Sequence, residues 1–200
     1  MLISDAVGLI RPTIPRTGGT WADIGAGDGM FTRALVELLG PTARIYAVDR
    51  DQEALADLED WAAEHGANVT TVVADFSQPF GLPDLGGGLL DGMLFANSLH
   101  FVPEPQDVLA QLAARVRPGG RIVFVEYERR APSRWVPYPI PAARLPELSL
   151  SAGLSLPVFV ASRPSAFGGS LYAASADRLA GRRPNESPLT GASSAGHTGS

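Results

Sequence analysis

The stretch WADIGAGDGM, residues 21–30, decides the fold that we expect for this chain of 200 residues. Its apolar start predicts a strand, and the helical pattern FTRALVELL, residues 31–39, follows directly. Glycines at 25, 27 and 29 let the backbone turn tightly between the two. They also let a ligand approach the helix amino terminus without a Cβ in the way. The stretch therefore predicts a ligand site at a strand-to-helix turn.

Outward from this stretch, strand-like and helix-like patterns alternate along the first 130 residues. The expected strands are TWADI, RIYAVD, NVTTVVADF, LLDGMLFANS and RIVFVEYE. The expected helices are FTRALVELL, DQEALADLEDWAAEH and PQDVLAQLAARV, and we expect Pro118-Gly119-Gly120 to end the last of them. This rhythm predicts βαβ units around a parallel sheet, in one α/β domain.

The texture of the sequence changes beyond residue 130. Five prolines between Ala131 and Pro146 predict an extended covering segment without a continuous helix. Two apolar runs, LPVFVAS and SLYAAS, then predict a hairpin that closes the sheet. We expect the domain to span residues 1–180. Residues 181–200 contain a single large apolar side chain, Leu189, and we expect them to form a disordered tail.

Composition excludes several kinds of chemistry. Cysteine is absent, which excludes disulfides, thiolate metal sites and a cysteine nucleophile, and the three scattered histidines predict no metal site. All 16 basic residues are arginine, so a lysine Schiff base is excluded as well. A net charge of −5 disfavours a nucleic-acid partner. The first residues fit neither a signal peptide nor a membrane span, and we expect a cytoplasmic protein without membrane contact.

The acidic residues in the glycine stretch indicate which ligand binds there. Two like charges about 4 Å apart repel by roughly 4 kcal/mol at an effective dielectric of about 20, so Asp23 and Asp28 are poor neighbours for a pyrophosphate. Met30 also stands where a dinucleotide fingerprint has its third glycine. A ligand with a carboxylate for the helix amino terminus, an ammonium for Asp23 and a nucleoside beyond is S-adenosylmethionine.

Two further carboxylates follow strands in register with this loop. Asp49 ends the strand IYAVD, where a carboxylate can accept hydrogen bonds from both ribose hydroxyls. Asp75 ends the strand VVADF and can accept from the adenine amino group, while Phe76 offers an apolar face to the ring. Phe76 could equally be a core residue. Together these residues favour S-adenosylmethionine as the cofactor.

With these residues the sequence resembles the class I S-adenosylmethionine-dependent methyltransferases. The resemblance is carried by D-I-G-A-G-D-G at 23–29, V-D-R at 48–50, A-D-F at 74–76, L-F-A-N-S-L-H-F at 94–101 and R-P-G-G-R-I at 117–122. It covers residues 20 to 176 and is strongest to small bacterial single-domain members with a generic methyltransferase domain. It implies a Rossmann-like fold with helices on both faces of a seven-stranded mixed sheet whose last strand is antiparallel. It also implies a cofactor lined by Asp23, Gly25, Gly27, Gly29, Asp49, Arg50, Asp75, Phe76 and Asn97.

The acceptor side is less sharply marked. His100 follows the fourth expected strand and could take a proton from a hydroxyl acceptor, or it could be a packing histidine. Glu126, Tyr127, Trp135 and Tyr138 could shape an acceptor pocket or pack against the sheet. The chain has Asn97-Ser98-Leu99-His100 in place of the D/N-P-P-Y/F motif of amino-methylating nucleic-acid enzymes. A small-molecule acceptor is therefore expected.

Charge is divided unevenly along the chain. Residues 1–130 carry 18 acids and 10 arginines, whereas residues 131–200 carry 3 acids and 6 arginines. A basic rim near the acceptor is one interpretation, because Arg134, Arg144 and Arg163 are interleaved with Trp135, Tyr138 and Phe167, and it would favour a neutral or anionic, partly apolar molecule. The other interpretation is that these arginines are solvated surface residues and that the aromatic residues belong to the core.

Three functions stay open at this stage. The first is methyl transfer to a small molecule by in-line displacement. The second is an S-adenosylmethionine-binding protein of methyltransferase fold without catalytic activity. The third, which Asp23, Asp28 and Met30 disfavour, is a nicotinamide-dependent oxidoreductase. The sequence does not define an oligomeric state.

Overall fold

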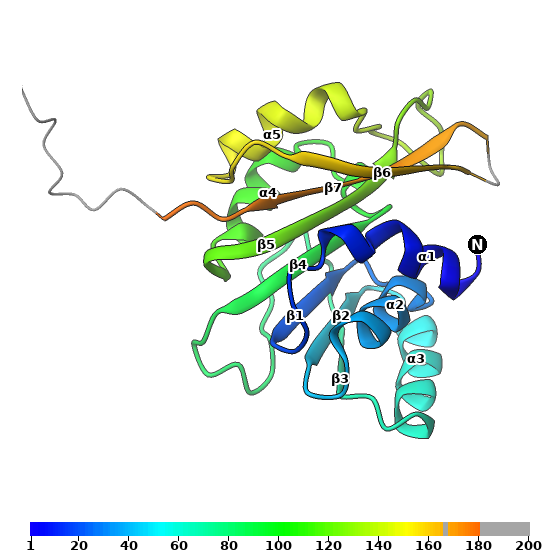
Figure 1. Ribbon diagram of the computed structural model, residues 1–200, viewed down its shortest axis with the longest axis vertical. Helices are drawn as coiled ribbons and strands as arrows, with labels where there is room; N and C mark the ends of the chain where they lie inside the picture. Colours follow the sequence, from blue (N-terminus) through cyan, green and yellow to red (C-terminus); the bar gives the residue numbers. More distant parts are fainter. Residues whose placement is uncertain (166–167, 181–200) are drawn as a thin grey trace, which may run out of the picture.

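A computed structural model describes residues 1–165 and 168–180 of the chain. Two expectations lie outside these described residues: the disordered tail at 181–200, and the place of Phe167 in the basic rim. In the described part, the chain folds into one sheet with helices packed on it (Figure 1).

Seven strands form the sheet in the order β3-β2-β1-β4-β5-β7-β6. Their bounds are β1 Thr20–Ile24, β2 Arg44–Asp49, β3 Val69–Val73, β4 Leu90–Ala96, β5 Val116–Tyr127, β6 Val158–Pro164 and β7 Ser170–Asp177. Strands β1 to β5 pair in parallel, and β7 runs antiparallel to both of its neighbours, β5 and β6. The predicted mixed sheet with an antiparallel last strand is confirmed.

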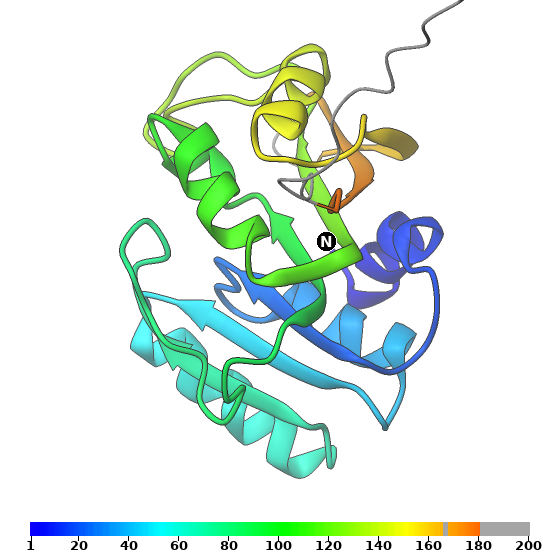
Figure 2. The same ribbon diagram turned by 90° about the vertical axis from the view of Figure 1, so that its left-hand side faces the viewer.

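Helices cover both faces of the sheet, as expected. One face carries α1 Ile3–Ile10, α2 Met30–Leu39 and α3 Gln52–Glu64, and the other carries α4 Pro105–Ala113 and α5 Leu145–Ser151. Figure 2 shows the green α4 and the yellow α5 across the sheet from the blue α1 and α2. Three short 3₁₀ helices, η1 Arg11–Thr13, η2 Leu99–Phe101 and η3 Ala142–Arg144, complete the described elements. None of the helices in the described ranges has the length and apolar character needed to cross a bilayer.

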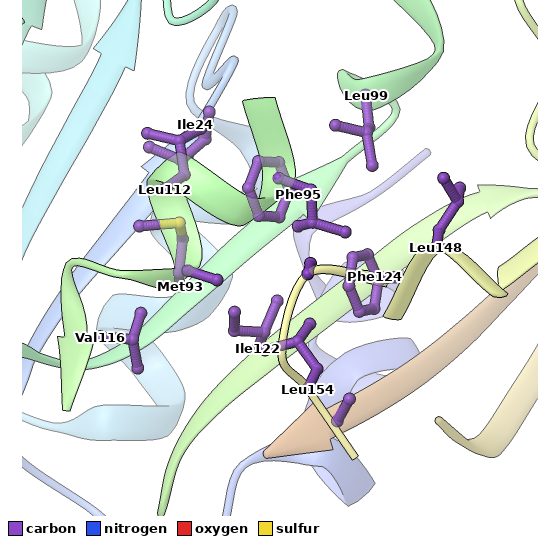
Figure 3. Close-up of a cluster of buried hydrophobic side chains, with 14 of the residues drawn as sticks. Ile24, Met93, Phe95, Leu99, Leu112, Val116, Ile122, Phe124, Leu148 and Leu154 are labelled. Carbon is purple, nitrogen blue, oxygen red and sulfur yellow. The ribbon is translucent and has the colours of Figure 1, made fainter. Parts of the chain in front are cut away.

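Alternation along the central strands builds two apolar layers. In β4, Phe95 is buried toward α4 and α5, whereas Leu94 and Ala96 are buried toward α1 and α2. Figure 3 shows the first of these layers, in which Phe95 and Phe124 stack with ring centroids 6.0 Å apart. Burying a large apolar side chain contributes about 1.5–3 kcal/mol, so the two layers hold the carboxyl ends of the parallel strands in fixed positions.

The end of α4 differs from the sequence prediction. We expected the helical pattern to run to Val116 and to stop at Pro118-Gly119-Gly120, but α4 ends at Ala113. Val116 pairs with Leu90 and begins β5, and a register shift follows between Leu90 and Gly92. The glycines therefore belong to an irregular strand start, because pairing with β4 overrides the helical periodicity.

Two helices were not predicted. Helix α1 buries Ala6, Val7 and Ile10, and its apolar residues recur at helical spacing, but Leu2 supplies no side-chain cap. Helix α5 begins at Leu145 with Pro146 in its first turn, where proline is tolerated. The last proline of the expected covering segment thus opens a helix. The segment before it has only an isolated bridge between Ser133 and Val136 and the short η3.

Candidate functional site

The loops after β1, β2, β3 and β4 border one cavity of about 1060 Å³. In an open α/β sheet, ligands bind at the carboxyl ends of the parallel strands, where this cavity lies. Eight of the residues predicted to contact ligands line it: Gly25, Gly27, Asp49, Arg50, Asp75, Phe76, Asn97 and Tyr127. The structure therefore brings together most of the expected cofactor residues, although they come from four separate loops.

The glycine loop leaves no room for side chains at two of its positions. Gly25 has φ +76°, and a Cβ there would lie 2.3 Å from the Cβ of Ser98. Gly29, the N-cap of α2, has the same φ, and a Cβ there would lie 2.4 Å from a methyl group of Leu58. Gly29 thus serves helix packing and does not line the cavity, whereas Gly25 both packs and lines it.

Backbone amides fix the two strand-end carboxylates. Asp49 Oδ2 accepts from Gly27 N at 2.8 Å, and its Oδ1 accepts from Asp51 N at 2.9 Å. Asp75 Oδ1 accepts from both the backbone N and the hydroxyl of Ser77, at 2.9 and 2.7 Å. These bonds to Ser77 lower the pKa of Asp75. Each oxygen of Asp49 keeps a second lone pair, and Asp75 keeps its Oδ2, so both groups can also accept from a ligand.

Asp23 lies beneath the glycine loop and outside the cavity wall. Its side chain is 1% exposed, and Thr32 Oγ1 donates to its Oδ2 at 2.7 Å. Burial raises the pKa of Asp23 to about 7, against the bond from Thr32, and the charges of Asp49 and Asp28 raise it further. Among the described residues, its other oxygen, Oδ1, has no hydrogen-bond partner. Asp23 can therefore accept one more donor, and a cation nearby would favour its ionised form.

The turn after β4 holds a second set of unpaired polar atoms. Asn97 has φ +53°, a left-handed conformation that asparagine tolerates better than most residues, and its N donates to Val125 O at 2.8 Å. Asn97 Oδ1 and Ser98 Oγ are buried and without a partner in the described part of the chain. Both residues line the cavity. A buried unpaired polar atom costs free energy, so these two atoms suit a ligand that hydrogen-bonds to them.

His100 forms a buried pair with Glu126. The His100 side chain is 2% exposed and Glu126 is 1% exposed, and His100 Nδ1 lies 2.6 Å from Glu126 Oε2. The backbone N of His100 donates to the other oxygen of Glu126 at 3.3 Å. Neither residue is part of the cavity lining. The ring centroid of His100, however, lies 4.6 Å from that of Phe101, and Phe101 does line the cavity. The pair is therefore buried, and neither member lies at the cavity surface.

The proline-rich segment keeps its aromatic residues away from the cavity. Trp135 is 65% exposed, and the guanidinium of Arg134 stacks on its ring at 4.2 Å. Tyr138 is 43% exposed and outside the cavity lining, and its backbone N donates to the carbonyl of His100. Of the arginines expected in the basic rim, Arg163 lines the cavity, while Arg134 and Arg144 do not.

The charge of the cavity is predominantly negative. Its lining contains five aspartates and two arginines: Asp5, Asp28, Asp49, Asp51, Asp75, Arg50 and Arg163. This excess of carboxylates favours a cationic ligand and disfavours a pyrophosphate. Within residues 1–165 and 168–180, no three histidine, aspartate or glutamate side chains group as metal ligands do.

Several lining residues were missed by the sequence prediction. Met1 precedes α1, Asp5 lies in its first turn, Phe101 comes from η2 and Leu171 from β7. The helical spacing of apolar residues in α1 could have identified that helix, and Phe101 follows a predicted site residue directly. No local signal marks Leu171, because only the pairing of β7 with β5 brings it to the cavity.

The strand order reverses between β1 and β4, and the cavity lies at the carboxyl ends of these strands. This position, together with the glycine turn and the strand-end carboxylates, defines an α/β protein that binds a nucleoside-containing ligand. Residues 22–120 match the family model described as a methyltransferase domain. Together with the fold and the sequence motifs, this match identifies the chain as a member of the class I S-adenosylmethionine-dependent methyltransferase family.

Relatives and solved structures agree with this assignment. The ubiquinone/menaquinone biosynthesis C-methyltransferase UbiE of Burkholderia mallei is 28% identical over 115 residues, 57% of this chain and 45% of that protein. The match therefore spans a little under half the length of that curated relative. An S-adenosylmethionine-dependent methyltransferase from Aquifex aeolicus has a TM-score of 0.68 at 18% identity, covering 88% of this chain and 90% of the other.

A further solved structure is that of a Burkholderia thailandensis 1,6-didemethyltoxoflavin-N1-methyltransferase with bound 1,6-didemethyltoxoflavin and S-adenosylhomocysteine. It has a TM-score of 0.68 at 23% identity and covers 89% of this chain and 78% of the other. At these identities, the structural likeness establishes the shared fold. It does not assign the substrates of those enzymes to this chain.

Proposed function

We propose that this protein transfers the methyl group of S-adenosylmethionine to a small-molecule acceptor. The observation that carries the proposal is the shared cavity, in which the glycine loop and the carboxylates of Asp49 and Asp75 meet at the carboxyl ends of adjacent parallel strands. Its excess of carboxylates suits a cofactor that carries both an ammonium and a sulfonium charge.

In this proposal each part of the cofactor has its own partner. Asp49 accepts from the ribose hydroxyls, and Asp75 from the adenine amino group, beside the ring of Phe76. The charge of the ammonium is balanced by Asp23. Its Oδ1 has no partner among the described residues, and its raised pKa shows that the buried carboxylate lacks a compensating positive charge, which the ammonium would supply. Asn97 offers its unpaired Oδ1 from the turn after β4. Arg50 lines the same end and is a further predicted contact.

The work left to the protein is mainly alignment. The bound cofactor would supply a methyl group on a sulfonium, and the sulfur is a good leaving group when a nucleophile attacks the methyl carbon in line with the carbon–sulfur bond. The cavity walls hold the acceptor at that position, and removing water from the pair lowers the cost of bringing them together.

A hydroxyl acceptor must also lose a proton, and His100 is the group that we assign to receive it. Glu126 accepts a hydrogen bond from the protonated Nδ1 of His100, which leaves Nε2 with its lone pair. The carboxylate also stabilises the imidazolium that forms when His100 takes the proton. The ring of His100 contacts that of Phe101, which lines the cavity, so the imidazole lies one side chain away from the cavity wall.

An activity assay with a broad acceptor panel tests the proposal. Because the related proteins include a C-methyltransferase and an N-methyltransferase, the panel should contain carbon, nitrogen and oxygen nucleophiles. We expect release of S-adenosylhomocysteine with at least one class of acceptor. Tight cofactor binding with no turnover across the panel would favour the alternative, a cofactor-binding protein without activity. The cytoplasmic location expected from the sequence stays a prediction.

A further inference from the structure

The cavity continues from the glycine loop to an end with a different lining. Among the residues that line that end are Met1, Asp5, Phe101, Tyr127, Arg163 and Leu171. Four of them are apolar or aromatic, and Phe101 is 46% exposed. In Figure 1, α1 lies beside the hairpin of β6 and β7, which supplies Arg163 and Leu171. This acceptor end is therefore an apolar wall interrupted by one pair of charges.

That pair joins α1 to β6. Arg163 Nη1 forms an ion pair with Asp5 Oδ1 at 2.9 Å, and the two side chains are 32% and 34% exposed. Asp5 Oδ2 accepts from the backbone N of Leu2 at 3.0 Å. The bond from Arg163 is the largest cause of a lowered pKa for Asp5, so the carboxylate is ionised at neutral pH. Both partners are therefore charged, and they join two elements, α1 and β6, that line the same cavity.

Arg163 has donors left for a ligand. A guanidinium carries five N–H donors in a planar fork, and Asp5 takes one of them, at Nη1. The other lining arginine, Arg50, directly follows β2 and lies beside Asp49 and Asp51, so Arg163 is the one cationic side chain among the described residues of the acceptor end. Such a fork pairs in bidentate fashion with a carboxylate or binds a phenolate oxygen.

Resting on the function proposed above, we infer that the acceptor is a flat, largely apolar molecule that carries an acidic oxygen, a carboxylate or phenolate, and that this oxygen binds Arg163. Phe101, Tyr127 and Leu171 contact its apolar body. Asp5 positions the guanidinium and offsets its charge, which restrains the affinity for anions. An anionic acceptor is also drawn toward the positive sulfonium of the donor, so charge favours the reactive arrangement.

The test uses two probes of the same shape, 2-naphthoate and 2-naphthamide, titrated calorimetrically into the protein saturated with S-adenosylhomocysteine. We expect naphthoate to bind more tightly than naphthamide. Arg163→Gln should weaken naphthoate about tenfold, the loss typical of one charge-assisted hydrogen bond, and leave naphthamide unchanged. Asp5→Asn should shift naphthoate binding the other way, to several-fold tighter, because Arg163 then keeps its full charge.

Two further variants make the result specific. Arg163→Lys keeps the charge but loses the planar fork, so its affinity for naphthoate should lie between those of the wild type and Arg163→Gln. Arg11→Gln removes an arginine from another exposed ion pair, 3.8 Å from Glu37 and outside the cavity lining, and it should change nothing. Unchanged binding of S-adenosylhomocysteine by each variant shows that the cofactor end is intact.

Three outcomes overturn the inference: equal binding of the two probes, no binding of either, or a naphthoate preference that survives Arg163→Gln. Failure of the wild-type protein to bind S-adenosylhomocysteine is a different result. It would contradict the proposed function itself, before the acceptor probes are added.

Discussion

The two ends of the cavity are built in different ways. At the cofactor end, the lining comes from the segments that follow β1, β2 and β3, and backbone amides hold the carboxylates of Asp49 and Asp75. At the acceptor end, the lining comes from α1, η2, β5, β6 and β7, and a side-chain ion pair joins two of these elements. The first end is fixed by hydrogen bonds from backbone amides, and the second by contacts between side chains far apart in the sequence. Substitutions at the two ends should therefore affect different measurements.

The largest expected effect concerns the buried acid beneath the cofactor end. Asp23 has a folded-state pKa of about 7, against an ordinary value of 3.8. Between pH 3.8 and about pH 7, the carboxyl of Asp23 stays protonated in the folded protein but loses its proton in the unfolded chain. The contribution of Asp23 to the free energy of unfolding therefore falls as the pH rises. About three pKa units correspond to roughly 4 kcal/mol.

Asp23→Asn removes this dependence and keeps an acceptor for Thr32. Denaturant unfolding at pH 4 and pH 8 should show wild type losing stability relative to Asp23→Asn as the pH rises. If the free energies of unfolding of the two proteins change in parallel with pH, the pKa of Asp23 is the same in the folded and unfolded states. Burial of its carboxylate would then not destabilise the cofactor end.

The next effect is on turnover at the acceptor end. His100→Gln keeps a donor for Glu126 but cannot serve as the base, so kcat for a hydroxyl acceptor should fall about a hundredfold, the lower range for general base catalysis. S-Adenosylhomocysteine affinity should not change. His65→Ala, an exposed histidine at the end of α3, is the control. Wild-type turnover by His100→Gln would mean that the buried pair with Glu126 is structural only.

Asp49→Ala should have a smaller effect, and on binding rather than turnover. It removes an acceptor from the ribose hydroxyls and frees the amides of Gly27 and Asp51, which weakens the cofactor by about tenfold to a hundredfold. Asp49→Asn, which keeps one carbonyl oxygen, should lose less. Asp57→Ala, on the exposed side of α3, should leave the dissociation constant unchanged, and an equal loss in that control would point to a general charge effect.

Trp135→Ala should have the smallest effect. The ring is 65% exposed and stacks on Arg134 outside the cavity lining, so we expect the KM of any acceptor to stay within about twofold, as for most surface substitutions. A clear rise in KM would restore the sequence-based hypothesis that this segment contacts the acceptor, and it would require the segment to move on binding.

The same difference explains what the sequence could predict. The glycine turn, Asp49 and Asp75 each stand at the end of a strand with clear apolar periodicity, so local patterns located the cofactor end. Asp5 and Arg163 are separated by nearly the whole chain, and only the packing of α1 beside β6 brings them together. The partner of His100 could not be predicted from its surroundings either, because Glu126 reaches it from the neighbouring strand β5.

The central claim is tested most directly by titration calorimetry of the wild-type protein with S-adenosylmethionine, S-adenosylhomocysteine and NADH. The structure of the cofactor end predicts saturable binding of the first two and much weaker binding of NADH, because the carboxylates that line it repel a pyrophosphate. Tighter binding of NADH than of both adenosyl compounds would contradict the account.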